Sequence, residues 1–129
     1  MGVFHVDCRI ENYRDRKKSL LMKGLLVDTG SEFSWVPAAR LKTIGVRIEK
    51  KDESFLMANG ALVYRAVGFA IIRLGDRFTI DEIVFAEPGD LALLGARTLE
   101  GLNLTIDPAR KKLVAAGPLP AAAGIKQSF

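Results

Sequence analysis

A short apolar run that ends in an acidic turn, Leu-Leu-Val-Asp-Thr-Gly-Ser at residues 25–31, is the most informative stretch of this chain. An aspartate at the end of an apolar strand is poorly solvated unless donors surround it. Gly30 allows a tight turn that brings a backbone N–H close to Asp28, while Thr29 and Ser31 add hydroxyl donors. The stretch therefore predicts a strand followed by a rigid loop that presents one carboxylate. A turn without any chemistry is the alternative interpretation of the tripeptide taken alone.

Short β-prone runs separated by turn residues surround this stretch. Residues 4–10 alternate between apolar and polar, which predicts a half-buried strand, and residues 20–27 predict an apolar one. Pro37 suits the first turn of a helix over residues 38–44, and Gly45 is a suitable end for it. Further strands are expected at residues 33–36, 55–57, 61–64, 67–74, 78–85, 91–94, 104–106 and 112–114, with one or two helical turns at 97–102.

Turn signals connect these strands. Asn59-Gly60 between two β-prone runs predicts a hairpin, because both residues accept positive φ. Gly75-Asp76-Arg77 predicts a second hairpin. The pattern favours an all-β barrel or sandwich with one or two short helices at residues 1–117. Residues 118–129 are rich in Pro, Ala and Gly, and we expect a flexible tail there.

Composition excludes several classes of protein. The 129 residues are 49% apolar and 26% charged, which is typical of one globular domain. One Cys and one His exclude an internal disulfide and a multi-Cys or multi-His metal site. No apolar run is long enough for a membrane span, and the N-terminus lacks the pattern of a signal peptide, so a cytoplasmic location is expected.

The net charge of +4 comes partly from two basic turns, at residues 14–18 and 110–112. Two solvated turns are the favoured interpretation, and a nucleic-acid or membrane-surface patch is the alternative. Aromatic residues do not alternate with these charges as they do in RNA-binding modules. The expectation is therefore no nucleic-acid partner and no membrane partner.

Three blocks of this sequence resemble the retropepsin-like aspartic proteases, including their small bacterial members. The first is residues 25–31, which look like the active-site loop of that family. The second is the Asn59-Gly60 hairpin, where the family carries its flap. The third is Leu93-Leu94-Gly95 with residues 98–108, which is similar to the apolar-apolar-Gly block and helix near the family's C-terminus. Together the blocks span residues 4–114.

The resemblance implies a retropepsin-like closed β-barrel with a flap hairpin, one half of a pepsin-like architecture. It implies an aspartic endopeptidase, a hydrolase of peptide or protein substrates, in which Asp28 is catalytic. We therefore expect no metal and no cofactor. Thr29 matches a threonine that bonds across a dimer, Gly30 matches a residue that contacts substrate, and Ser31 belongs to the same loop. The flap and substrate-binding residues would be Met57, Ala58, Asn59, Gly60 and Ala61.

A second carboxylate is the main requirement of this chemistry. Peptide hydrolysis by this route uses two carboxyl groups that lie close together and share one proton. No other Asp in the chain is followed by Thr-Gly or Ser-Gly. The partner of Asp28 is therefore expected to be Asp28 of a second copy, in a symmetric homodimer.

Two other functions remain open at this stage. One is a non-catalytic dimeric peptide-binding or scaffold module of the same fold. The other is a small β-barrel that binds nucleic acid through its basic turns.

The remaining distinctive residues have simpler interpretations. His5 is expected to face solvent or to be satisfied within its strand, and Cys8 is expected in the core. Trp35 is expected either to line a substrate subsite or to pack against the helix. Phe33 and Phe85 are expected in the core. A Glu32–Arg97 ion pair is an open question that the resemblance raises.

Overall fold

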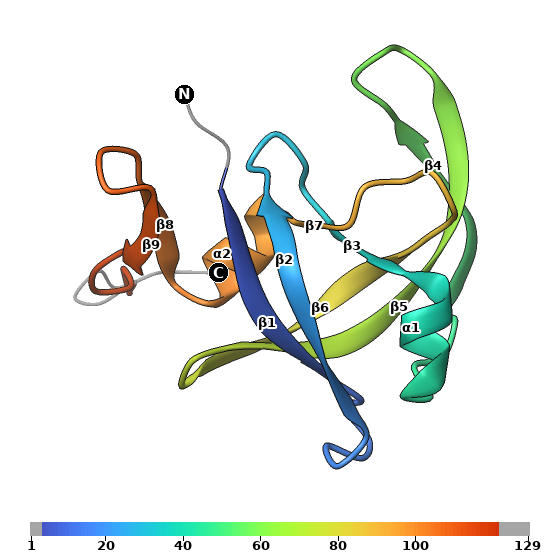
Figure 1. Cartoon of the computed structure of the whole chain (residues 1–129), viewed down its shortest axis with the longest axis horizontal. Coiled ribbons are helices and arrows are strands. Elements are labelled where there is room, and N and C mark those ends of the chain that lie inside the picture. Colours follow the sequence, from blue (N-terminus) through green and yellow to red (C-terminus); the bar gives the residue numbers. More distant parts are fainter. Residues whose placement is uncertain (1–3, 122–129) are drawn as a thin grey trace, which may run out of the picture.

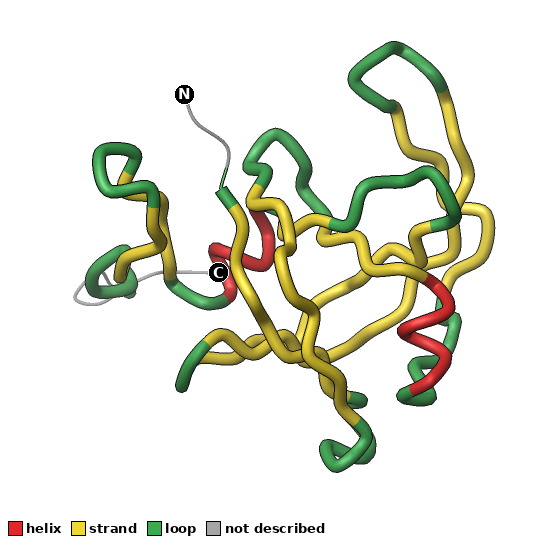
Figure 2. The backbone as a smooth tube through the Cα atoms, viewed as in Figure 1, coloured by secondary structure: helices red, strands yellow, loops and turns green. Residues whose placement is uncertain are grey.

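Nine strands and two helices are formed by residues 4–121, the part of the chain that the computed structural model describes (Figures 1 and 2). The strands are β1 (His5–Glu11), β2 (Ser19–Val27), β3 (Ser34–Pro37), β4 (Lys50–Leu56), β5 (Leu62–Leu74), β6 (Arg77–Ala86), β7 (Leu93–Leu94), β8 (Leu104–Asp107) and β9 (Lys112–Ala115). The helices are α1 (Ala38–Thr43) and α2 (Ala96–Gly101). The prediction of a mostly β domain with two short helices is confirmed.

Seven of the strands form one mixed sheet that nearly closes into a ring. Their order is β1-β2-β7-β3-β6-β5-β4, and β1 also pairs with β5. Two of the neighbouring pairs, β2 with β7 and β3 with β6, are parallel. β8 and β9 form a separate hairpin beside this sheet (Figure 1). A nearly closed sheet leaves few strand edges with free backbone groups. The outer edge of β4 is such an edge.

The interior of the ring is filled by the apolar faces of the strands. Cys8 and Ile10 of β1 are buried while His5 and Arg9 are exposed, as the alternation of apolar and polar residues predicts. Phe85 is also in the core, as expected. Burial raises the pKa of the Cys8 thiol to about 12, so Cys8 is a packing residue and not a thiolate at neutral pH.

Several boundaries differ from those predicted. β5 runs without a break from Leu62 to Leu74, because pairing with β4 and then with β6 satisfies it along its whole length. The predicted strand at 91–94 shortens to Leu93–Leu94, and Leu91 is exposed. Residues 118–121 have no regular secondary structure, and the rest of the predicted tail, 122–129, lies outside the described residues.

A buried polar network ties β3, β6, β7 and α2 together at the centre of the fold. The Oγ of Ser34 accepts a hydrogen bond from the backbone N–H of Gly95 (2.9 Å) and shares one with the Oγ1 of Thr98 (2.6 Å). Thr98 in turn donates to the Oδ2 of Asp81 (3.0 Å). Ser34 and Thr98 are fully buried, so each loses its hydration on folding and depends on these partners.

We expect Thr98→Val to lower the free energy of unfolding by about 1.5 kcal/mol, because Ser34 and Asp81 each lose a partner in the core. The matched control is Thr105→Val, the same change at an exposed position of β8, which should change stability by less than about 0.5 kcal/mol. Urea unfolding followed by circular dichroism measures both. Equal effects in the two variants would show that the network contributes nothing specific.

Candidate active site

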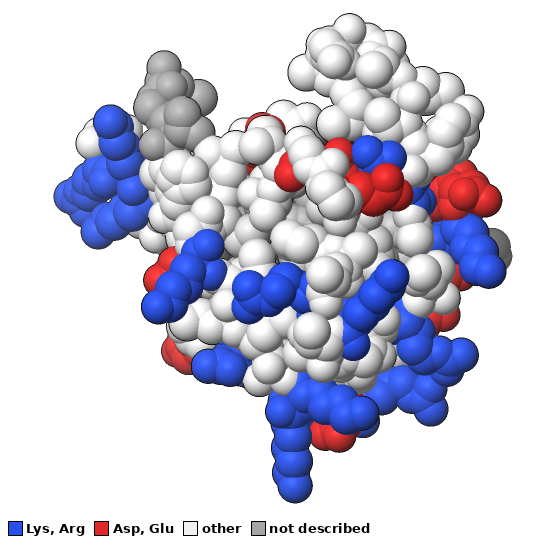
Figure 3. Space-filling model, turned by 45° about the vertical axis from the view of Figure 1, so that its right-hand side comes forward, with Lys and Arg blue, Asp and Glu red and all other residues white. Residues whose placement is uncertain are grey.

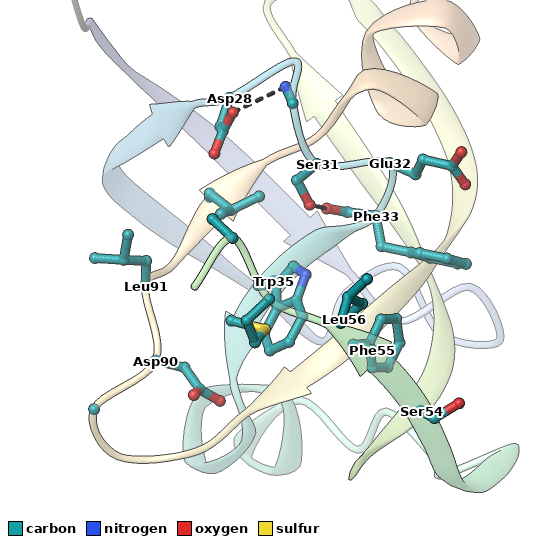
Figure 4. A pocket seen from close by; sticks show the side chains of 15 residues that line it. Asp28, Ser31, Glu32, Phe33, Trp35, Ser54, Phe55, Leu56, Asp90 and Leu91 are labelled. Atoms are coloured by element: carbon teal, nitrogen blue, oxygen red, sulfur yellow. Dashed lines mark hydrogen bonds between the residues drawn. The ribbon is translucent and has the colours of Figure 1, made fainter. Parts of the chain in front are cut away.

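Asp28 follows the last residue of β2, at the point where β2 lies parallel to β7. Its backbone N–H donates to the carbonyl of Leu94 (3.0 Å), which extends the β2–β7 pairing by one bond. The side chain is half-buried and lies beside an open groove (Figure 4). The predicted strand and acidic turn are therefore present, with the carboxylate accessible from the groove.

The loop after Asp28 is held by its own hydrogen bonds. The backbone N–H of Gly30 donates to Oδ1 of Asp28 (2.9 Å), and the N–H of Ser31 donates to the carbonyl of Asp28 (3.2 Å). The Oγ of Ser31 donates to the carbonyl of Phe33 (2.9 Å) instead of to Asp28. A Cβ at position 30 would lie 3.1 Å from Oδ1 of Asp28, which explains the preference for glycine there. Thr29 is exposed at the tip of the loop.

The start of α2 holds the same loop from behind. The backbone N–H groups of Ala96 and Arg97 donate to the carbonyls of Ser31 (2.8 Å) and Glu32 (3.0 Å). Gly95 crosses so close to the loop that a Cβ on it would lie 2.4 Å from the carbonyl oxygen of Phe33. The loop is thus fixed by a segment more than 60 residues later in the chain, and its carboxylate has a defined position.

A groove of about 620 Å³ extends from Asp28 towards the hairpin of β4 and β5. It is lined by Asp28, Gly30, Ser31, Glu32, Phe33, Trp35, Ser54, Phe55, Leu56, Met57, Ala58, Gly89, Asp90, Leu91 and Leu93. In Figure 1 the β4–β5 hairpin and the loop at 28–33 stand on opposite sides of the upper part of the molecule. The groove therefore runs between a loop that carries a carboxylate and a projecting hairpin.

Aromatic side chains form one wall of the groove. The ring of Phe55 lies edge-on to Trp35 (5.2 Å between centroids) and to Phe33 (5.6 Å). Trp35 lines the groove and packs on Phe55, so this aromatic contact connects β3 with β4. Phe33 was expected in the core, but it is half-buried: it packs against the buried cluster around Trp35 and also lines the groove.

The predicted flap residues form the tip of the β4–β5 hairpin. The N–H of Met57 donates to the carbonyl of Ala61 (2.8 Å), and the N–H of Gly60 donates to the carbonyl of Met57 (2.9 Å). Only Gly60 has positive φ (85°), so Ala58 and Asn59 occupy the centre of the turn and Gly60 is the bulge that follows it. The predicted hairpin at Asn59-Gly60 is therefore present. Of these two residues only Gly60 uses positive φ, and the side chain of Asn59 instead accepts a hydrogen bond from the N–H of Ala61 (2.9 Å).

The hairpin tip only partly faces the groove. Met57 and Ala58 line it, whereas Asn59, Gly60 and Ala61 are exposed beyond its lining. The structure thus brings Asp28, Gly30 and Ser31 together with Met57 and Ala58, and leaves the rest of the hairpin tip and Thr29 at the surface.

Arg97 pairs with Glu82 and not with Glu32. Its guanidinium lies 3.2 Å from Oε2 of Glu82 and over the ring of Phe33 (4.8 Å to the centroid). The Glu32 carboxylate is exposed and points away from Asp28 in Figure 4. The contact between Arg97 and Glu32 is a hydrogen bond between their backbones, from the N–H of Arg97 to the carbonyl of Glu32. The side chain of Arg97 extends towards Glu82 in β6.

A clamp that the sequence reading missed closes the far end of the groove. Arg65 of β5 binds Asp90 in a bidentate pair, with Nε–Oδ2 at 2.7 Å and Nη2–Oδ1 at 2.9 Å. The Arg65 guanidinium holds the pKa of the Asp90 carboxyl below its ordinary value. Asp90 also accepts a hydrogen bond from the N–H of Glu87 (2.7 Å). The Arg65–Asp90 pair therefore fixes the loop at 87–90 to β5 of the β4–β5 hairpin. No local motif signals this contact, because 25 residues separate the two side chains.

Comparison with known proteins adds no relative: no protein-family model matches the chain, and no curated protein sequence matches it significantly. What fold and site define is a small β domain with a carboxylate beside a partly aromatic groove. Within residues 4–121, no cluster of three His, Cys, Asp or Glu side chains is arranged to hold a metal ion. The polar groups that line the groove include the carboxylates of Asp28, Glu32 and Asp90 and the hydroxyls of Ser31 and Ser54.

We expect Asp90→Asn to destabilise the fold by about 2 kcal/mol, because the Arg65 guanidinium loses its bidentate partner and keeps only the longer ion pair with Glu87 (3.8 Å). The matched control, Asp76→Asn in the exposed β5–β6 turn, should change stability by less than about 0.5 kcal/mol. Urea unfolding at neutral pH measures the two variants.

The same ion pair predicts a dependence on pH. A carboxyl whose pKa is lowered by folding contributes its full stabilisation above the pKa of the unfolded state, and loses it as the pH falls through the lower pKa of the folded state. The difference in stability between the wild type and Asp90→Asn should therefore shrink below the ordinary pKa of an aspartate. A difference that stays constant through this acid range would contradict the role of the charge.

Proposed function

We propose that this protein is a homodimeric aspartic endopeptidase with a retropepsin-like barrel, in which Asp28 of each subunit supplies one half of the catalytic pair. The observation that carries the proposal is the position of Asp28: a carboxylate fixed by Gly30 and by the β7–α2 segment, at the open side of a peptide-sized groove. The exposed tip of its loop leaves room for a second copy of the same loop.

A dimer supplies what one chain lacks. The other carboxylates that line the groove are Glu32, which points away from Asp28, and Asp90, which is paired with Arg65 (Figure 4). Two Asp28 side chains across a two-fold axis would share one proton, because like charges at that distance do not both ionise. Thr29, next to the carboxylate and exposed, is the residue that would hydrogen-bond across the axis.

The reaction needs only this pair and a water molecule. The ionised carboxylate takes a proton from the water, whose oxygen attacks the peptide carbonyl carbon. The protonated carboxyl donates its proton to the carbonyl oxygen, and a tetrahedral diol results. When the C–N bond breaks, the leaving amine takes the proton held by the pair, and one hydroxyl of the diol returns a proton to the pair as the carboxylic acid product forms.

The substrate in this proposal is an extended peptide that lies in the groove. β4 pairs only with β5, so its other edge has free backbone groups, and residues 54–58 along that edge line the groove. A peptide that adds to this edge as a strand gains main-chain hydrogen bonds. Phe55, Met57 and Leu91 offer apolar contacts to its side chains. Movement of the hairpin tip at 57–61 would admit the peptide and then exclude water.

The first test removes the carboxylate alone. Asp28→Asn should abolish hydrolysis of an unstructured protein substrate such as casein, while the dimer seen by sedimentation persists. Asp52→Asn, the same change at an exposed residue of β4 with positive φ (55°), should keep full activity. Hydrolysis that survives in Asp28→Ala would overturn the aspartic mechanism. Peptide binding to the wild type without hydrolysis would indicate the non-catalytic dimeric module instead.

The second test uses concentration and pH. Specific activity should fall when the enzyme is diluted below its dimer dissociation constant, because each site needs two chains. Activity at fixed concentration should follow a bell-shaped pH profile on the acidic side, since both carboxyls are protonated at low pH and both are ionised at high pH. Activity independent of dilution, or a flat profile from acid to neutral pH, would contradict a shared-proton pair.

A further inference from the structure

The tertiary structure gathers the basic residues in a way that the sequence does not suggest. The two basic turns of the sequence, at 14–18 and 110–112, lie apart: the first joins β1 to β2 and the second joins β8 to β9, on different sides of the molecule (Figure 1). The turn at 14–18 instead lies beside α1 and the residues that follow it. This neighbourhood, and not the pair of turns, forms the main basic surface.

Three contacts join these segments. The Nδ2 of Asn12 donates to the carbonyl of Ile44 (2.9 Å), and Lys18 packs over Gly45, with its Nζ 3.9 Å from where a Cβ would lie. The guanidinium of Arg40 in α1 reaches the carbonyl of Leu21 in β2 (3.4 Å). The hairpin turn, the outer part of β2 and the α1 segment are therefore one continuous surface. We call it the basic surface, formed by Arg14, Arg16, Lys17, Lys18, Lys23, Arg40, Lys42 and Arg47.

The charge of the chain is concentrated on these two segments. Residues 12–24 and 38–47 contain eight Lys or Arg and one Asp, whereas the rest of the chain contains eleven basic and fourteen acidic residues. All eight basic side chains are exposed, and within residues 4–121 none of them is in an ion pair. In the lower half of Figure 3, blue side chains are numerous among the white atoms and few atoms are red. Asp15, and Glu11 near Arg16, offset only part of the positive potential of this surface.

Three exposed apolar side chains adjoin these basic residues along the chain. Leu21 lies between the hairpin turn and Lys23 and is 41% exposed, Ile48 follows Arg47 and is 43% exposed, and Tyr13 opens the hairpin turn and is 37% exposed. A convex surface that combines Lys and Arg with aliphatic and aromatic side chains matches a membrane interface, where the cations meet anionic headgroups and the apolar groups enter the boundary below them. The loop at 28–33 and the β4–β5 hairpin, which line the groove of the proposed active site, lie in the upper part of Figure 1, whereas the β1–β2 turn lies at the bottom.

We propose that the basic surface docks this protein on the surface of an anionic phospholipid bilayer, as a peripheral contact. None of the helices among the described residues is long and apolar enough to span a membrane. Each Lys or Arg near an anionic bilayer contributes about 1 kcal/mol, so several acting together suffice for reversible binding. The proposal replaces the expectation of no membrane partner, and it does not depend on the proposed proteolysis.

The test is co-sedimentation of the whole protein with vesicles of phosphatidylcholine, with and without phosphatidylserine. Binding should be at least about tenfold stronger with the anionic lipid, and should weaken when the salt is raised from about 0.1 M to about 0.5 M, as the charges are screened. Equal binding to both vesicles, or no binding to either, would overturn the proposal.

Two charge-reversal variants locate the contact. Lys17→Glu with Lys18→Glu should lower vesicle binding at least about tenfold, whereas Arg110→Glu with Lys112→Glu changes the net charge equally on the other hairpin and should have a small effect. Equal losses would mean that only net charge matters and would overturn the assignment. Circular dichroism checks folding, and Lys17→Gln with Lys18→Gln replaces the first variant if it does not fold.

Binding to nucleic acid is compared with binding to anionic vesicles. A single-stranded RNA and a DNA duplex are titrated into the same protein at the same salt concentration. Tighter binding to either than to anionic vesicles, with the same loss in the Lys17→Glu/Lys18→Glu variant, would assign the surface to nucleic acid and overturn the membrane proposal. Leu21→Ser should weaken vesicle binding and leave any oligonucleotide binding unchanged, because only the bilayer offers an apolar phase to that side chain.

Discussion

The parallel pairing of β2 with β7 is the constraint on which the groove and its carboxylate depend. It aligns Val27 with Leu94 and lets the N–H of Asp28 bond to the carbonyl of Leu94. The segment that follows β7 then lies directly against the loop that follows β2, and only glycine at position 95 allows the close approach to Phe33. Because the start of α2 also binds the carbonyls of the acidic loop, a single strand pair positions both the carboxylate and its support.

Polar contacts within and around this close approach give the site its rigidity. The buried hydroxyls of Ser34 and Thr98 satisfy each other and the N–H of Gly95 below the loop. On the other side of the groove, the Arg65–Asp90 pair holds the β4–β5 hairpin against the loop before β7. The groove is thus held by polar contacts at both of its ends and lined by aromatic packing between them.

Local features of the sequence were predictable where a few neighbouring residues suffice to specify them. Alternation over residues 4–10 identified β1, and Pro37 with Gly45 bounded α1. The hairpin at Asn59-Gly60 was found, but its turn type was not, because the side chain of Asn59 caps the loop in place of a second positive φ. Phe33 was assigned to the core on its apolar character alone, and the structure places it at the edge of the buried cluster around Trp35, where it lines the groove.

The sequence by itself determined the strand that ends just before Asp28, the hairpin at Asn59-Gly60 and the mostly β class, because these depend on patterns within a few neighbouring residues. The tertiary structure decided that Arg97 binds Glu82, that Arg65 clamps Asp90, and that the basic turn at 14–18 joins α1 and not the turn at 110–112. The physical reason is that charges and hydroxyls select partners by distance in space, and the closure of the sheet sets those distances.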